Sequence, residues 1–179
     1  MPMRKSIPRI LAIDPGSKEM GIAFLEGEHD LVYHAVKSFR CERTQKVILR
    51  EVRQAITRLI SMFRPDTLVI ERLYYIQQEG SPVLKRVYQE LNAIGRKNGL
   101  KVIELAPNTI RKTIVDDGRA TKLEVARILA HRFPQLQASL IEEKRKKWQQ
   151  KYWLNMFDAV AAGLAWQKLK PETKRNCRI

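Results

Sequence analysis

Cysteine is nearly absent from this sequence: Cys41 and Cys177 are the two cysteines among 179 residues. Two cysteines cannot build a disulfide framework or a cysteine-based zinc cluster, so the composition favours a reducing compartment. The sequence also lacks a run of about 18 apolar residues, which a membrane-spanning helix would need. Its basic start leads into an apolar stretch that stops at Asp14. That stretch is too short for a secretion signal, and we expect neither export nor a membrane anchor.

Acidic residues are also scarce, because 19 Asp and Glu stand against 34 Lys and Arg and give a formal net charge of +15. Such an excess of positive charge favours a polyanionic partner, and nucleic acid is the first candidate. Hydrophobic residues make up 44% of the chain, which is enough to bury one ordinary core. We therefore predict one domain over residues 1–170, followed by a basic and disordered tail over residues 171–179.

Apolar runs and helical periodicity predict an α/β fold with a five-stranded sheet of mixed direction, flanked by helices. The predicted strands cover residues 10–14, 21–27, 31–39, 67–71 and 100–105. The first three should form an antiparallel meander. The predicted helices cover residues 45–63, 81–97, 122–133 and 156–169, and Pro107 should start a short helical turn.

Three acids stand in apolar surroundings that do not explain them. Asp14 and Glu71 each end a short apolar strand, and Asp158 lies among apolar residues of the last helix, one turn after Asn155. Burying a bare carboxylate costs several kcal/mol, roughly, unless a positive charge compensates it. Hard cations such as Mg²⁺ and Mn²⁺ bind to carboxylates of this kind. We therefore predict that the three acids hold divalent metal ions.

Four motifs occur in the order IDPGS, VIER, a helix that carries a lysine, and NMFDAVAAGLAW. Together they resemble the RuvC family of Holliday junction resolvases, within the ribonuclease H-like fold, over nearly the whole chain. The resemblance implies a homodimer that makes paired nicks across a four-way DNA junction, with two Mg²⁺ or Mn²⁺ ions held at Asp14, Glu71 and Asp158. A fourth acid is implied at the position of Asn155, whose amide can bind a cation but brings no charge.

The same resemblance implies roles in binding DNA. Tyr74 matches an aromatic residue that wedges against bases, while Arg111 and Lys122 match basic residues that face the scissile phosphate. Lys122 would stabilise the transition state. Between Lys122 and Asn155 this chain is longer than usual members of the family, and the extra length falls in residues 139–153. Basic side chains alternate there with aromatic ones, in a pattern that suits DNA strands. The basic residues of this insertion assigned to DNA are Lys144, Lys146 and Lys147.

The predicted function is a Mg²⁺- or Mn²⁺-dependent endonuclease that resolves four-way junctions in the cytoplasm or at the nucleoid, with an organelle or a virus left open as its source. An alternative is a protein that binds junctions but cleaves weakly or not at all, because Asn155 replaces an acid. IDPGS is also similar to the first phosphate loop of actin-like ATPases and sugar kinases, but those need two such lobes. A relative that processes ribosomal RNA precursors is the third alternative, although such proteins are typically shorter.

Overall fold

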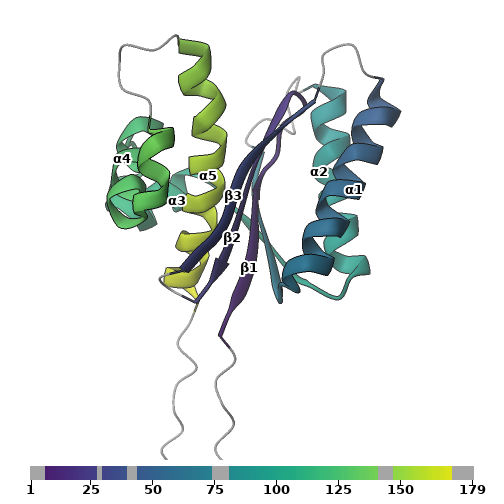
Figure 1. The fold of residues 1–179 in the computed structure, drawn as a ribbon, viewed down its shortest axis with the longest axis horizontal. Coiled ribbons are helices and arrows are strands. Elements are labelled where there is room, and N and C mark those ends of the chain that lie inside the picture. Colours follow the sequence, from purple (N-terminus) through teal and green to yellow (C-terminus); the bar gives the residue numbers. More distant parts are fainter. Residues whose placement is uncertain (1–6, 28–29, 40–43, 74–80, 141–146, 171–179) are drawn as a thin grey trace, which may run out of the picture.

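A five-stranded sheet with helices on both faces forms the centre of the molecule (Figure 1). The computed structural model describes residues 7–27, 30–39, 44–73, 81–140 and 147–170. For residues 147–151 it describes the backbone alone. The predicted fold class, a mixed sheet flanked by helices, is therefore confirmed. No helix in these ranges is long and apolar enough to cross a membrane. The predicted tail over residues 171–179 lies outside them.

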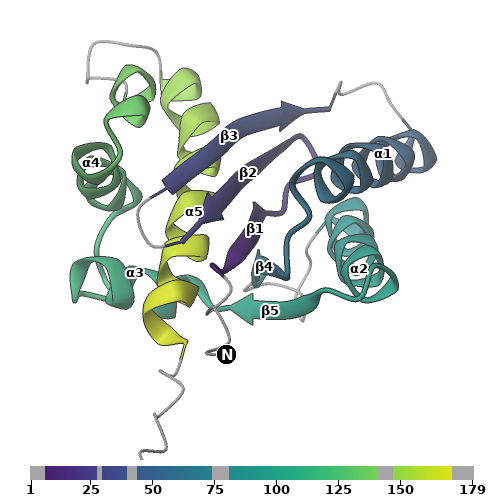
Figure 2. The ribbon, with the colours of Figure 1, turned by 60° about the horizontal axis from the view of Figure 1, so that its bottom comes forward.

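The strand order is β3-β2-β1-β4-β5 (Figure 2). The strands are β1 (Arg9–Asp14), β2 (Glu19–Glu26), β3 (Asp30–Ser38), β4 (Thr67–Glu71) and β5 (Lys101–Leu105). β1, β2 and β3 form the predicted antiparallel meander. β4 runs parallel to both β1 and β5. The carboxyl ends of these three parallel strands therefore meet at one edge of the sheet, where β2 begins.

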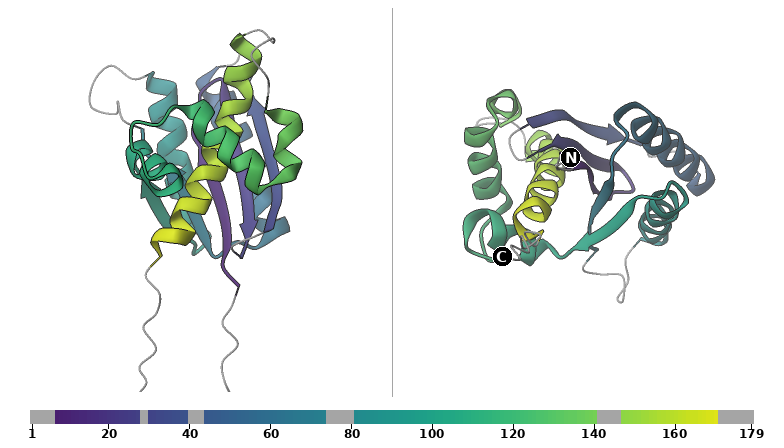
Figure 3. Two further views of the ribbon diagram at one scale, coloured as in Figure 1. Left: turned by 90° about the vertical axis from the view of Figure 1, so that its left-hand side faces the viewer. Right: turned by 90° about the horizontal axis from the view of Figure 1, so that it is seen from below.

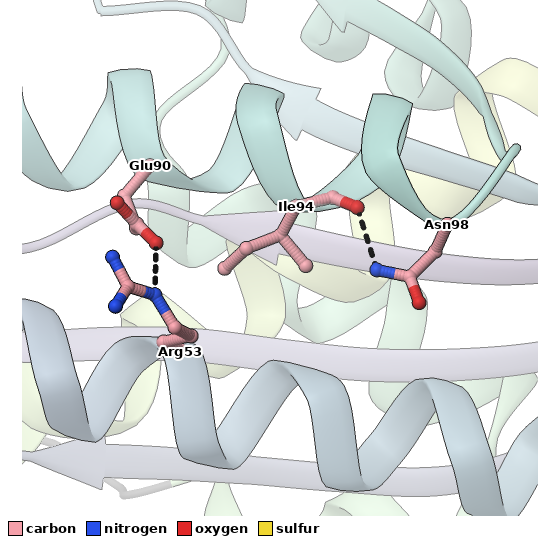
Figure 4. Close-up of polar contacts among 4 residues, drawn as sticks. All are labelled: Arg53, Glu90, Ile94 and Asn98. Carbon is pink, nitrogen blue, oxygen red and sulfur yellow. Dashed lines mark hydrogen bonds and ion pairs between the residues drawn. The ribbon is translucent and has the colours of Figure 1, made fainter.

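Helices α1 (Gln45–Phe63) and α2 (Pro82–Lys97) cover one face of the sheet. Their apolar sides are buried against the strands, as the helical spacing predicts. The buried residues are Ile48, Val52, Ile56 and Leu59 on α1, with Val87, Tyr88, Leu91 and Ile94 on α2. Arg53 Nε of α1 donates a hydrogen bond of 2.7 Å to Glu90 Oε1 of α2 (Figure 4). The amide of Asn98 closes the end of α2 by donating to the Ile94 carbonyl at 2.8 Å.

The other face carries α5 (Lys147–Leu169), with α3 (Pro107–Val115) and α4 (Lys122–Arg132) packed against it (Figure 3). The short 3₁₀ helix η1 (Pro134–Ser139) packs against α4. α5 lies directly on β1 and β2 because two glycines remove side chains from the contact. A Cβ on Gly21 would overlap the Asn155 carbonyl oxygen, and one on Gly163 would overlap the Leu25 side chain. The last helix is therefore held close to the strand ends.

Two helices are longer than predicted. The expected short turn at Pro107 is a nine-residue helix, because Ile110 and Ile114 are buried in the layer around α5. The last helix, expected from Met156, begins at Lys147. Part of the apparent insertion is therefore the first two turns of α5. Trp153 lies on this extension and packs against the apolar cluster that contains Ile110.

Candidate active site

Asp14 and Glu71 lie side by side at the carboxyl ends of neighbouring parallel strands. Ile13 of β1 pairs with Ile70 of β4, so the residue that follows each of them occupies the same level of the sheet. Adjacent strands are about 4.8 Å apart. Alternation along the strands directs both acids toward the face that α5 covers, because Ala12 and Val69 belong to the apolar cluster on that face.

Asp158 joins these two acids from α5. Its residue surface is 8% exposed, and it is the one charged residue among the buried residues of the described chain. Its neighbours in the helix, Phe157 and Ala159, belong to the core. The close packing of α5 at Gly21 fixes the helix at Asn155, one turn before Asp158. The position of the third acid thus follows from helix packing rather than from a loop.

The pKa values of the acids show that the three carboxylates interact. Burial raises the pKa of Asp14 well above its usual value, and the charges of Asp158 and then Glu71 raise it further. Burial, followed by the charge of Asp158, raises the pKa of Glu71 to about 7. Burial also raises the pKa of Asp158, against the opposing effect of Lys122. Three acids from β1, β4 and α5 therefore share one poorly hydrated site.

Two cations lie within electrostatic reach of these acids. Lys122, the first residue of α4, donates a hydrogen bond from Nζ to Asp158 Oδ2. Burial opposes its charge, but the attraction of Asp158, Asp14 and Glu71 outweighs burial and raises the pKa of Lys122. Arg111 of α3 lowers the pKa values of Glu71 and Asp158. Both cations predicted from the sequence are thus at the site.

The start of α4, which positions Lys122, is fixed by a capping box. The hydroxyl of Thr121 accepts a hydrogen bond of 3.2 Å from the backbone nitrogen of Glu124. The Glu124 carboxylate accepts one of 2.6 Å from the backbone nitrogen of Thr121. These two bonds satisfy backbone donors that the first turn leaves free, and they set where the helix begins.

Asn155 also lies at this edge of the sheet, next to an acid that the sequence analysis missed. Its Nδ2 donates a hydrogen bond of 3.2 Å to Oε2 of Glu19, the first residue of β2. Alternation from Gly21 could have placed Glu19 on this face, but the predicted strand began at Gly21 and left Glu19 in a turn. Tyr74, Lys144 and Lys146 lie outside the described residues, as does the side chain of Lys147.

The chemistry of the acids fits a divalent cation. Their carboxylate oxygens are the ligands that Mg²⁺ and Mn²⁺ prefer, and a divalent charge would offset the repulsion that raises their pKa values. Within the described ranges, no group of three or more His, Cys, Asp or Glu side chains lies in an arrangement that could hold a metal ion as it stands. Lys122 is bonded to Asp158 instead. A cation that binds to Asp158 would therefore compete with the Lys122 ammonium.

A wide groove between β3 and α1 is not part of this site. It is lined by residues such as Tyr33, Arg58 and Met62, and none of the three acids contributes to it. Its lining includes residues of α1, whereas the acids face α5 on the other side of the sheet. The groove is therefore separated from the acids by the sheet.

Comparison with known proteins is consistent with the geometry. The family model described as "Crossover junction endodeoxyribonuclease RuvC" matches residues 10–142. The protein of that name from Akkermansia muciniphila is 28% identical over 122 residues, which cover 66% of this chain and 73% of the relative. That from Alkalilimnicola ehrlichii is 31% identical over 125 residues, covering 66% and 74%. Thermus thermophilus RuvC in complex with a Holliday junction substrate has a TM-score of 0.69 at 20% identity, covering 88% and 92%.

Proposed function

Because the chain belongs to the RuvC family of crossover junction endodeoxyribonucleases, we propose that it is a metal-dependent endonuclease that resolves four-way DNA junctions. The observation that carries this proposal is the meeting of Asp14, Glu71 and Asp158 from three separate elements. Two relatives carry the name of such an enzyme. The structural neighbour from Thermus thermophilus is a complex with a Holliday junction substrate.

Asp14, Glu71 and Asp158 would hold the metal ions, with the amide oxygen of Asn155 as a neutral fourth ligand. A pair of Mg²⁺ or Mn²⁺ ions supplies, when bound, charge neutralisation for the attacking and leaving oxygens of phosphodiester hydrolysis. The support for this ligand set is its residue types and the mutual repulsion of its acids, which leaves the site in need of positive charge.

Lys122 and Arg111 would act on the scissile phosphate. Both side chains already lie within electrostatic reach of Asp158. An ammonium held there neutralises charge that develops on the phosphoryl oxygens in the transition state. Lys122 would thus exchange Asp158 for the phosphate when DNA and metal bind. Arg111, with its planar fork of donors, suits a second phosphate oxygen.

The remaining DNA contacts are proposed from the sequence. Tyr74 would stack on a base near the junction centre, and such stacking contributes about 1 to 3 kcal/mol per base. Lys144, Lys146 and Lys147 would bind the backbone of a strand. The formal charge of +15 supports a DNA partner, because each phosphate that a basic residue neutralises releases a counterion.

Paired cuts need two active sites, and we propose that a homodimer supplies them. We expect α2 to contribute to the dimer interface, but most of its apolar residues are buried in the core of its own chain. Val87, Leu91 and Ile94 are buried against the sheet. The exposed side of α2 carries residues such as Lys85 and Arg86. A dimer formed there would rest on polar contacts more than on apolar burial.

The second candidate is a junction-binding protein that cleaves weakly or not at all. One observation favours it: Asn155 offers an uncharged amide where the family resemblance implies an acid, so the site holds less negative charge for a cation. Binding would persist under this reading because the positive charge of the chain does not depend on the acids.

A strand-resolved cleavage assay separates the two candidates. A mobile four-way junction, labelled on each strand in turn, is incubated with the protein and Mn²⁺. We expect nicks at symmetric positions on two opposing strands. Asp14→Asn should lower the cleavage rate by a factor on the order of 100 or more, because the cluster loses the charge that binds the cation.

Asp30→Asn is the matched control. Asp30 is exposed at the start of β3, and it pairs with Glu26 at the end of β2 remote from Glu19. Its variant should cut as fast as the parent. A junction that is bound yet stays intact under all metal conditions would support the binding protein instead. Asp14→Asn cutting at the parent's rate would remove Asp14 from the site.

A further inference from the structure

The side-chain amide of Asn155 donates a hydrogen bond to the carboxylate of Glu19, and this bond fixes which end of the amide faces Glu19. The bond of 3.2 Å joins Asn155 Nδ2 to Glu19 Oε2. An ionised carboxylate can only accept hydrogen bonds, so it must face the NH₂ group of the amide and not its oxygen. Glu19 therefore engages the half of the amide that cannot bind a cation. The amide oxygen, which can bind one, is left for another partner.

Strand pairing and a tight turn place Glu19 next to the site. Asp14 pairs with Gly21 across β1 and β2, so Glu19 is the diagonal neighbour of Asp14 on the same face of the sheet, at a Cα separation of about 7 to 8 Å. The turn between the two strands is tight at Gly16, where a Cβ would overlap the Glu19 carbonyl oxygen. A short turn thus fixes Glu19 beside the end of β1.

α5 approaches at the same point. Gly21 has no side chain to separate β2 from the Asn155 backbone, so Asn155 lies directly over the strand that carries Glu19. Glu19 is partly buried there, whereas its neighbour Lys18 is exposed. The pairing of Glu19 with Asn155 therefore rests on the hydrogen bond and, independently, on the packing of α5 at Gly21.

We infer that Glu19 is a positioning residue that makes Asn155 usable as a metal ligand, a role that rests on the proposed function. Glu19 orients the amide by holding its nitrogen. It also restores to this corner of the site the negative charge that an asparagine lacks. When a residue that is hydrogen-bonded to a metal ligand is substituted, the metal affinity commonly changes about 10- to 100-fold.

The test is Mn²⁺ affinity, measured by calorimetry on the full chain, with the melting temperature of the metal-free protein recorded alongside. Glu19→Gln should weaken Mn²⁺ binding about 10-fold, because the charge is lost and the amide is no longer held by an obligate acceptor. Glu26→Gln is the matched control, at the opposite end of β2, where Glu26 pairs with Arg9 at 3.4 Å. It should bind Mn²⁺ as the parent does.

The second arm uses the coupling of the two residues. Asn155→Asp should bind Mn²⁺ as tightly as the parent or more tightly, and cleave junctions at least as fast. In that background the Glu19 carboxylate would face another carboxylate. Glu19→Gln should then cost no affinity. A purely structural Glu19 predicts a lower melting temperature and an unchanged Mn²⁺ affinity in both backgrounds, so the two hypotheses differ in the Mn²⁺ affinity of Glu19→Gln in the parent. Glu19→Asp, which shortens the reach, should also weaken binding and serves if Glu19→Gln does not fold.

The outcomes separate this inference from the proposed function. If the parent binds Mn²⁺, Asp14→Asn abolishes that binding and Glu19→Gln leaves it unchanged, the inference about Glu19 is wrong while the active site stands. If the parent does not bind Mn²⁺, or if Asp14→Asn binds it as tightly as the parent, both the proposed metal site and the role of Glu19 are wrong.

Discussion

At the scale of single residues, the site is a balance of buried charges. If all three were ionised, Asp14, Glu71 and Asp158 would stand against Lys122 and Arg111 with one negative charge in excess among these five residues. Burial makes that excess costly, and the raised pKa values of Asp14, Glu71 and Asp158 express the cost. A divalent cation would turn the excess positive, which suits a site that must accept a phosphodiester.

The stability of the metal-free protein should fall as the pH rises, because Glu71 is buried among like charges. The folded-state pKa of Glu71 is about 7, above its usual 4.5. Between these values the folded protein holds a proton that the unfolded chain has released. The contribution of Glu71 is therefore fully present below pH 4.5 and is lost as the pH rises through about 7. We expect a loss on the order of 2 kcal/mol in the free energy of unfolding.

Urea denaturation at pH 5 and pH 8, with a chelator present, measures this loss. Glu71→Gln is the control, because it cannot titrate and should flatten that part of the profile. Adding Mg²⁺ or Mn²⁺ should stabilise the parent more at pH 8 than at pH 5. A parent profile that coincides with that of Glu71→Gln would contradict the raised pKa.

At the scale of secondary-structure elements, the contact of α5 with β2 determines where Asp158 lies. Gly21→Ala would place a methyl group against the Asn155 carbonyl oxygen, and backbone cannot give way there as a flexible side chain can. We expect a loss of roughly 1 to 3 kcal/mol or more in stability, as for overpacked cores. We also expect the cleavage rate of the folded variant to fall, beyond what the loss of folded protein explains, since α5 carries Asp158 and Asn155.

Gly118→Ala is the control for this substitution. A Cβ on Gly118 would meet its nearest neighbour, the Asn108 carbonyl oxygen, at an ordinary 3.5 Å. Its variant should melt and cut close to the parent. If thermal unfolding and junction cleavage of Gly21→Ala match those of Gly118→Ala, the close contact between α5 and β2 does not position the site.

The elements could be predicted where a single pattern decides them. The strand from Ile10 is apolar without alternation because helices cover both of its faces, and the helix after Thr44 has an uninterrupted apolar stripe. The lengths of α3 and α5 could not be predicted in the same way. Both depend on tertiary packing, which buries Ile110 and Ile114 and supports the polar start of α5 through Trp153.

At the scale of the whole molecule, the topology assembles the site from distant parts of the chain. The parallel pairing of β1 with β4 aligns Asp14 with Glu71, and α5 adds Asp158 across the same edge. Sequence patterns could identify these acids because each stands out against apolar neighbours. Glu19 does not stand out, because it sits among the polar residues of a turn. Alternation from Gly21 indicates the face on which Glu19 lies, but its place beside Asp14 depends on the register of β1 against β2, which is a property of the folded sheet.

Metal binding by the three acids is tested most directly in a crystal of this protein grown with Mn²⁺, with anomalous diffraction measured at the manganese edge. We expect manganese bound by oxygens of Asp14, Glu71 and Asp158, with the Lys122 ammonium moved off Asp158. Manganese bound elsewhere, or none at these three acids at a concentration that supports cleavage, would contradict it.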